Sequence, residues 1–251
     1  MAYVDLALGM LAFWPALALG SFVNVVAARV PLKRSVVKPR SACMSCGAEL
    51  AWYDNVPVLS YFLLRGKCRS CGTRISPLYP AVELATAGLV AACIVVFGLT
   101  GIGVLSAFFC TVLVAITSTD ITHRIVPNRI VVPAAAIVLV AHTALDPSPQ
   151  WAVGALGASG FLFVAALAYP AGMGMGDVKL ALLLGAMLGK LVAVGLMLGM
   201  LFALVPSVVL LARHGSAARK MGIPFAPFLA LGAVVALFVG NELLSAYLST
   251  F

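Results

Sequence analysis

Residues 191–211 read LVAVGLMLGMLFALVPSVVLL, a run without a single charged side chain. A helix needs about 20 apolar residues to cross the roughly 30 Å hydrocarbon core of a bilayer, so this run predicts a transmembrane helix. We expect eight spans in total, the remaining seven at residues 6–28, 80–98, 101–119, 130–145, 151–170, 177–189 and 227–248. Of these, the run at 177–189 is the weakest candidate.

The composition agrees with a membrane protein of helices alone. Of 251 residues, 63% are hydrophobic and only 10% are charged, and the mean hydropathy is +1.12; soluble domains are about a quarter charged. The apolar runs are continuous, unlike the alternating strands of about ten residues in an outer-membrane barrel. The many Ala and Gly residues suit close helix packing in lipid. We therefore predict an all-α polytopic membrane protein whose first apolar run is a retained span, because no basic region precedes it.

The positive charges predict how these spans are oriented. Residues 29–79 form the one long polar segment and hold nine of the sixteen Lys and Arg residues. Placing this segment in the cytoplasm puts every other cation except Lys190 on the same face, as the positive-inside rule requires. Both termini then lie outside. The net charge of +8 is explained by orientation and by anionic lipid, so we predict the bilayer and not nucleic acid as a partner.

The chain accordingly divides into a first transmembrane helix (1–28), a cytoplasmic loop domain (29–79) and a membrane domain of seven helices (80–251). The loop contains CMSCG and CRSCG, which place Cys43, Cys46, Cys68 and Cys71 in two Cys-x-x-Cys pairs. Two such knuckles suit a tetrahedral structural zinc ion, in a small zinc-ribbon-like domain that the metal holds together. Two disulfides are the alternative, disfavoured in a reducing cytoplasm; a redox pair or docking module is another. Cys93 and Cys110 lie in predicted spans and are interpreted as packing residues.

Two aspartates stand at the inner ends of different predicted spans. Asp177 follows the glycines 172, 174 and 176, and taken alone it is interpreted as a helix N-cap. Asp120 ends the run VLVAITST, where a carboxylate opposes the helix dipole; a solvated residue paired with Arg124 is the alternative. If the two converge, one ionised and one protonated carboxyl group give the acid–base pair of an aspartic protease. The glycines would then expose backbone to an extended substrate.

Several segments resemble bacterial type IV prepilin peptidases, the prepilin leader peptidase/N-methyltransferase family of GxGD-type membrane aspartyl proteases. The resemblance covers nearly the whole chain. It is carried by GSFVNVVAARVP (20–31), the cysteine segment (41–84), TDITHRIVPN (119–128), GMGD (174–177), GDVKLALLLGAMLG (176–189) and IPFAPFLALG (223–232). Pro-Asn at 127–128 departs from the more frequent Pro-Asp.

The resemblance implies an inner-membrane enzyme that cuts the basic leader from prepilins and pseudopilins at the cytoplasmic face. It also implies methylation of the new N-terminal amine by S-adenosylmethionine, as in the members that have the cysteine loop. Asp120 and Asp177 would be the protease pair. The four loop cysteines would bind zinc.

The sequence does not locate the methyl-transfer site, because it lacks a Gly-rich strand-to-helix turn of the Rossmann kind. Asn24, Glu49 and Glu83 are candidates near the inner face, although Asn24 also suits an interhelical hydrogen bond and Glu83 a first-turn position. His123 lies three residues after Asp120 and is either a residue that tunes it or a hydrated histidine at the interface, whereas His142 and His214 carry no signal. Two other functions stay open: a peptidase without methyl transfer, and a cation-coupled transporter that uses both carboxylates.

Overall fold

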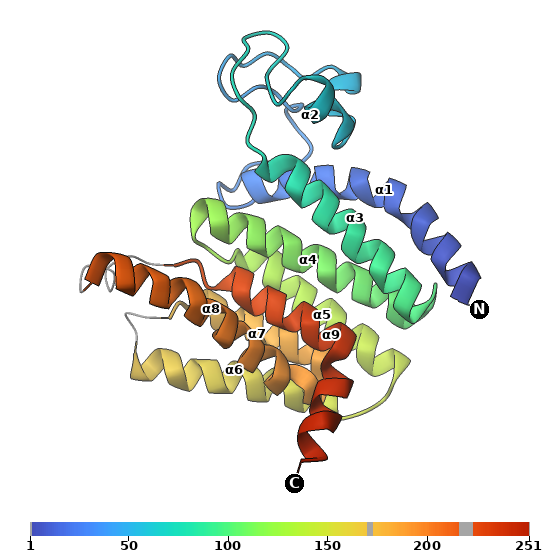
Figure 1. The fold of residues 1–251 in the computed structure, drawn as a ribbon, viewed down its shortest axis with the longest axis vertical. Coiled ribbons are helices and arrows are strands. Elements are labelled where there is room, and N and C mark those ends of the chain that lie inside the picture. The colour runs from blue at the N-terminus through green and yellow to red at the C-terminus, as the bar shows by residue number, and fades with distance from the viewer. Residues whose placement is uncertain (1, 170–172, 216–222, 251) are drawn as a thin grey trace. The chain divides into compact units, whose positions relative to one another are not determined.

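The computed structural model describes residues 2–169, 173–215 and 223–250 (Figure 1). Regular structure in these ranges is helical, and β-structure is limited to two isolated bridges. The elements are α1 (Ala2–Arg29), η1 (Trp52–Asn55), α2 (Leu59–Leu63), α3 (Leu78–Phe97), α4 (Gly101–His123), α5 (Asn128–Leu145), α6 (Gln150–Ala168), α7 (Met175–Leu188), η2 (Gly189–Leu191), α8 (Val192–His214) and α9 (Ala226–Leu248). The all-α prediction is confirmed.

Within the described ranges, seven stretches are long and apolar enough to cross a membrane. One of them, Met175–His214, has 40 residues, about 60 Å of helix and twice the thickness of the hydrocarbon core. It contains a turn at η2, where Gly189 has a φ of +52°. One groove is lined by successive turns of α6 together with Gly189 and the first turns of α8. After Gly189, α8 therefore runs back in the direction opposite to α7. The stretch is therefore two helices, as predicted.

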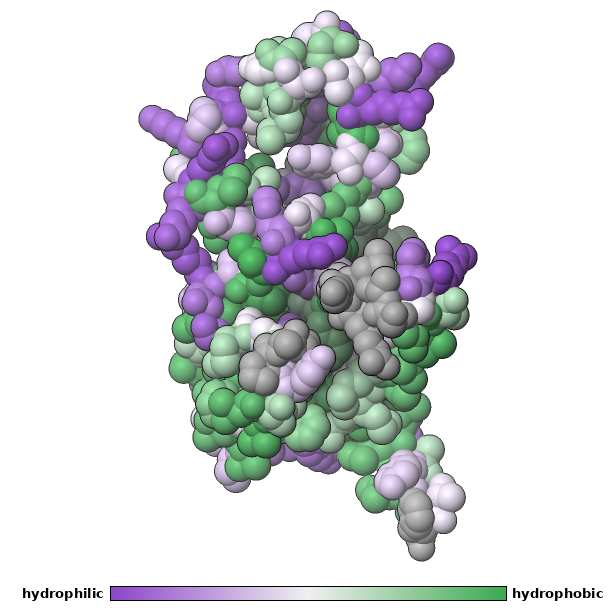
Figure 2. Space-filling view, turned by 90° about the vertical axis from the view of Figure 1, so that its left-hand side faces the viewer, coloured by the Kyte–Doolittle hydropathy of each residue, from purple (hydrophilic) through white to green (hydrophobic). Residues whose placement is uncertain are grey.

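The surfaces of these helices are suited to lipid. Hydrophobic residues dominate the helical surfaces in the space-filling view, whereas hydrophilic ones gather on the cysteine segment (Figure 2). Large apolar side chains such as Trp14, Val140 and Leu156 are about 70% exposed. A soluble protein would not leave so much contiguous apolar surface to water. The chain is a multi-pass membrane protein.

The chain forms two compact units, Met1–Thr119 and Asp120–Phe251, with the division inside α4. In the first unit α1 packs along α3 (Figure 1). The two helices approach closely at Gly20, where a Cβ atom would lie 2.6 Å from the Cα of Glu83. Val23, Val82, Val114 and Ala115 form a buried cluster that includes α4. Cys93 and Cys110 are fully buried between α3 and α4, which confirms them as packing residues.

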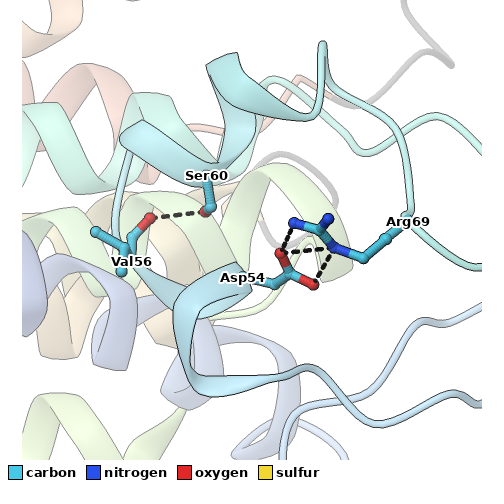
Figure 3. Close-up of polar contacts among 4 residues, drawn as sticks. All are labelled: Asp54, Val56, Ser60 and Arg69. Carbon is cyan, nitrogen blue, oxygen red and sulfur yellow. Dashed lines mark hydrogen bonds and ion pairs between the residues drawn. The ribbon is translucent and has the colours of Figure 1, made fainter.

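The cysteine segment belongs to the first unit and connects α1 to α3. Arg69 and Asp54 join its two halves: the guanidinium donates through Nε and Nη2 to both carboxylate oxygens, at 2.6–3.1 Å (Figure 3). This bidentate pair lowers the pKa of Asp54, because the hydrogen bonds and the positive charge favour the ionised form. In the same segment the Ser60 hydroxyl donates to the Val56 carbonyl at 2.7 Å (Figure 3).

The second unit is organised around α7. Nine of its 14 residues are buried, because α5 and α6 pack against it. At the crossing with α6, a Cβ atom on Gly154 would lie 2.8 Å from the carbonyl oxygen of Gly185, and one on Gly185 would overlap the backbone of Gly154. α8 packs along α9 through Gly199 and Gly232 in the same way. Small residues thus allow the close backbone approach expected in lipid.

The crossing of α6 and α7 should not tolerate a methyl group. We expect Gly185→Ala to lower the midpoint of thermal unfolding in detergent, because the new Cβ meets backbone that cannot rotate away; overpacking costs about 1–3 kcal/mol. Gly157→Ala is the control, because nothing lies within 4 Å of its Cβ position and alanine is the better helix former. Equal midpoints for the two variants would contradict this packing.

The ion pair in the cysteine segment should give a pH-dependent stability. The pKa of Asp54 is lower in the folded protein than in the unfolded chain. The ion pair therefore stabilises the segment at pH values above the unfolded pKa of about 3.9, and this stabilisation is lost as the pH falls through the lowered pKa of the folded protein. Asp54→Asn should therefore speed amide exchange in residues 52–70 at pH 7, and the difference from wild type should shrink steadily as the pH falls below about 3.9. A difference that does not shrink below this pH would mean that the pair is not responsible.

Candidate functional site

Asp120 lies in the last turn of α4 and is buried, with 6% of its surface exposed. Its Oδ2 accepts a hydrogen bond of 3.1 Å from the backbone N–H of Ala226, the first residue of α9. The carboxylate therefore satisfies a free N–H at a helix N-terminus, where the dipole favours negative charge. This contact offsets the unfavourable position at the end of α4. The alternative of a solvated surface pair with Arg124 is wrong, because Asp120 is buried.

Asp177 is the third residue of α7 and is half-buried. The N-cap is Gly174, so the interpretation of Asp177 as the N-cap is wrong by one turn. Its Oδ2 instead accepts from the Gly174 N–H at 3.4 Å, while its own N–H donates to the Gly174 carbonyl at 3.1 Å. This is the backward-reaching half of a capping box. It fixes the carboxylate next to Gly174; Gly172 lies outside the described residues.

The segments that carry the two aspartates meet within the second unit. A Cβ atom on Gly176 would lie 2.9 Å from the Cβ of Val126, so glycine permits the start of α7 to approach the loop after α4. Lys179 Nζ donates to Asn128 Oδ1 at 2.9 Å, which gives the unusual Asn of the Pro-Asn pair a partner. The carboxylates of Asp120 and Asp177 interact electrostatically. The two acids are 57 positions apart in the sequence but close enough in the fold for their charges to interact.

The four loop cysteines also come together. Their sulfur atoms all lie within 4.8 Å of one another, and the Sγ atoms of Cys43 and Cys71 are 3.8 Å apart. A tetrahedral zinc ion with Zn–S bonds of about 2.3 Å requires S···S separations of about 3.8 Å. All four are free thiols, so the disulfide alternative is not the state described. The residues present therefore fit a metal ion.

The two knuckles have the same backbone geometry. The N–H of Cys43 donates to the Ala48 carbonyl at 2.9 Å, and the N–H of Cys68 donates to the Thr73 carbonyl at 2.8 Å. Each turn closes through a glycine, Gly47 or Gly72, with a φ of about +70°, a conformation that L side chains rarely adopt. The duplicated CxxCG spacing predicted these two turns.

The thiols do not ionise independently. The hydrogen bond with the Thr73 hydroxyl lowers the pKa of Cys71 to about 6. At Cys46 the backbone N–H of Ala48 lowers the pKa, but the neighbouring sulfurs of Cys71 and Cys43 raise it to about 11 overall. Four thiolates this close require a cation to be stable together, which is the condition that a divalent metal meets.

The remaining candidates are placed as follows. Asn24 Nδ2 donates to the Tyr79 carbonyl at 3.0 Å. This is the interhelical hydrogen bond expected for Asn24 as the alternative to a role in methyl transfer. Glu83 accepts a 2.7 Å hydrogen bond from the N–H of Val58, a long-range contact without a signal in the sequence. His142 is buried and stacks on Trp151, with ring centroids 3.6 Å apart. His123, His214 and Glu49 are exposed.

Two family models match the chain. Residues 15–97 match the bacterial peptidase A24 N-terminal domain, and residues 107–212 match the type IV leader peptidase family. The second match contains both aspartates, and the first contains all four loop cysteines. No solved structure matches the chain significantly.

Curated relatives are similar along most of the chain. A prepilin leader peptidase/N-methyltransferase of Bacillus subtilis is 38% identical over 92% of this chain and 94% of the relative. One from Pseudomonas aeruginosa is 33% identical over 92% of this chain and 90% of the relative. One from Myxococcus xanthus is 41% identical over 72% of this chain and 56% of the relative. The chain therefore belongs to the prepilin leader peptidase/N-methyltransferase family.

Proposed function

We propose that this protein cuts the basic leader from type IV prepilins and pseudopilins and then methylates the new N-terminal amine with S-adenosylmethionine. The observation that supports this best is the meeting of Asp120 and Asp177 in one environment, each tied to the backbone at a helix end. Relatives of the same name cover nearly the whole chain.

In the proposed cleavage step, Asp120 and Asp177 carry one proton between them. The ionised carboxylate takes a proton from a water molecule as that water attacks the scissile carbonyl carbon. The protonated carboxyl group then gives its proton to the leaving amine as the C–N bond breaks. This division of roles between paired carboxyl groups is the logic of aspartic proteases.

The helix ends around the aspartates suit this chemistry. The Ala226 N–H bond holds one carboxylate, and the Gly174 N–H bond holds the other. Gly174 is exposed and presents no side chain beside Asp177, so we propose that an extended substrate backbone lies against it. A helical substrate must unwind locally to expose the scissile bond.

We further propose that the protein lies in the bacterial inner membrane with both termini outside. The support is the charge distribution, because the cysteine segment and the residues near both aspartates carry the Lys and Arg excess typical of cytoplasmic loops. A basic leader that does not cross the bilayer would then wait on the face where Asp120 and Asp177 stand.

Methyl transfer is the second proposed activity. S-adenosylmethionine supplies a sulfonium-bound methyl group, and the lone pair of the newly exposed amine attacks its carbon as the S–C bond breaks. The four loop cysteines would hold a structural zinc ion, because four thiolates leave no ligand position for water. Zinc there would stabilise the first unit without entering either reaction.

The two aspartates should be required for cleavage. We expect Asp120→Asn and Asp177→Asn each to reduce prepilin cleavage at least 100-fold, since general acid–base catalysis contributes about 10²–10⁴. Cleavage of one purified prepilin, followed by mass spectrometry, measures this. Glu242→Gln on the exposed end of α9 is the control and should cleave normally. Near-normal cleavage by either Asn variant, with an unchanged unfolding midpoint, would refute the catalytic role.

The cysteine cluster should bind one zinc ion per chain. Elemental analysis of purified protein should find about one zinc, and Cys46→Ser should lose it and unfold at a lower temperature, because metal binding contributes directly to the stability of such small domains. Cys110→Ser, between α3 and α4, should keep the metal. A zinc-free Cys46→Ser variant that still methylates at the wild-type rate would show that the cluster is not needed for methyl transfer.

A further inference from the structure

The first unit contains an open cavity of about 470 Å³ between the cysteine segment and the adjoining ends of α1 and α3. Its size lies in the range of roughly 300–1,000 Å³ typical of small-molecule sites. Residues of α1, α3, both knuckles and α2 contribute to its wall, so it exists only because the segment folds back onto the helices. The sulfur-bearing residues Cys43 and Cys68 form part of this wall.

Three of the eight acidic residues of the chain line this one cavity: Glu49, Asp54 and Glu83. Arg69 neutralises Asp54. Within the described residues, neither Glu49 nor Glu83 forms an ion pair. Glu83 is 7% exposed and its carboxylate accepts hydrogen bonds only from neutral groups, the Val58 N–H and Ser21. A buried carboxylate without a cation is stabilised by a cationic ligand.

The cavity also offers groups that could bind the carboxylate and the purine of a ligand in which an amino acid is joined to a nucleoside. Three arginines line it, and two are already used: Arg29 donates to the carbonyls of Ser35 and Arg40, and Arg69 binds Asp54. Arg74 has no ion pair among the described residues and is placed to bind a ligand carboxylate. The rings of Tyr61 and Tyr79 supply flat apolar surface for a purine.

A strained turn before α2 is bound by one of the acids of the cavity, Glu83. Val58 has a φ of +61°, which a β-branched residue rarely adopts. Its N–H is bound by Glu83 and its side chain packs against the cluster of Ala16, Leu17 and Ala87. Strain of this kind persists only where surrounding contacts enforce it, and it gathers at functional sites. Glu83 therefore has two roles: it positions this turn and presents negative charge to the cavity.

We infer that this cavity binds S-adenosylmethionine, with Glu49 and Glu83 facing its positive sulfonium and ammonium groups and Arg74 facing its carboxylate. The inference rests on the methyl transfer proposed above and assigns it to the first unit. In the transfer, the amine forms the new C–N bond, the S–C electron pair remains on sulfur as a neutral thioether, and the methylated ammonium releases a proton. Glu49, exposed and unpaired, is the carboxylate available to receive that proton.

The test measures binding of tritiated S-adenosylmethionine to the full-length protein in lipid nanodiscs. Ala28→Phe puts a ring into the cavity wall from the last turn of α1, and Glu49→Gln removes one charge without changing shape. We expect each to raise the dissociation constant at least 10-fold. Ala18→Phe is the matched control: it lies on the same helix, is exposed, and does not line the cavity, so it should bind as wild type.

A second measurement does not depend on the variants folding. Ultraviolet cross-linking of the tritiated donor to wild-type protein, followed by peptide mapping, should place the label within residues 21–83. Label confined to residues 120–251 would overturn the inference.

The outcomes also separate this inference from the proposed function. If wild type binds the donor and methylates while Ala28→Phe and Glu49→Gln, with normal unfolding midpoints, bind it equally well, the cavity assignment is wrong and methyl transfer stands. If wild type cleaves prepilin but neither binds the donor nor methylates, the proposed second activity itself fails. Loss of binding in both variants and not in Ala18→Phe supports the assignment.

Discussion

A bilayer core contains no water, so every backbone polar group inside it must find its partner within the protein. This constraint makes the chain helical and leaves unpaired N–H and C=O groups only at the helix ends. The polar side chains of interest stand at those ends. Asp120 satisfies the first N–H of α9, and Asp177 satisfies the N–H of Gly174. The groups that would perform the chemistry are therefore also groups that complete the helix ends.

This double use favours both the reaction and the fold. A carboxylate that accepts a backbone hydrogen bond is held in one orientation, which lowers the entropy that a reacting group must lose. The same bond makes each aspartate contribute to the stability of α7 or α9. An amide side chain keeps the acceptor oxygen and removes the acid, which is why asparagine is a sharper substitution here than alanine.

Much of this arrangement could be predicted from the sequence because it depends on local patterns. Apolar runs of about 20 residues gave the spans, and the repeated CxxCG spacing gave two knuckles with positive-φ glycines. The juxtaposition of Asp120 and Asp177 followed only as a hypothesis from charge and topology. Contacts between distant residues were not predictable: nothing near Asp120 in sequence indicates Ala226, 106 positions later, and nothing near Glu83 indicates Val58. The cavity of the first unit depends on such contacts, so the candidates Asn24, Glu49 and Glu83 had no common location until the fold was known.

The weakest predicted span corresponds to α7, the most buried helix of the second unit. Its short length would affect how the enzyme responds to the thickness of its membrane. α7 has 14 residues, about 21 Å of helix, against a hydrocarbon thickness of roughly 30 Å. Its neighbours α5, α6 and α8 have 18, 19 and 23 residues, so they and not α7 set the fit to the bilayer. Through this hydrophobic mismatch, the thickness of the bilayer would set how far the Asp177 end of α7 lies below the headgroups, deeper in thicker membranes and shallower in thinner ones.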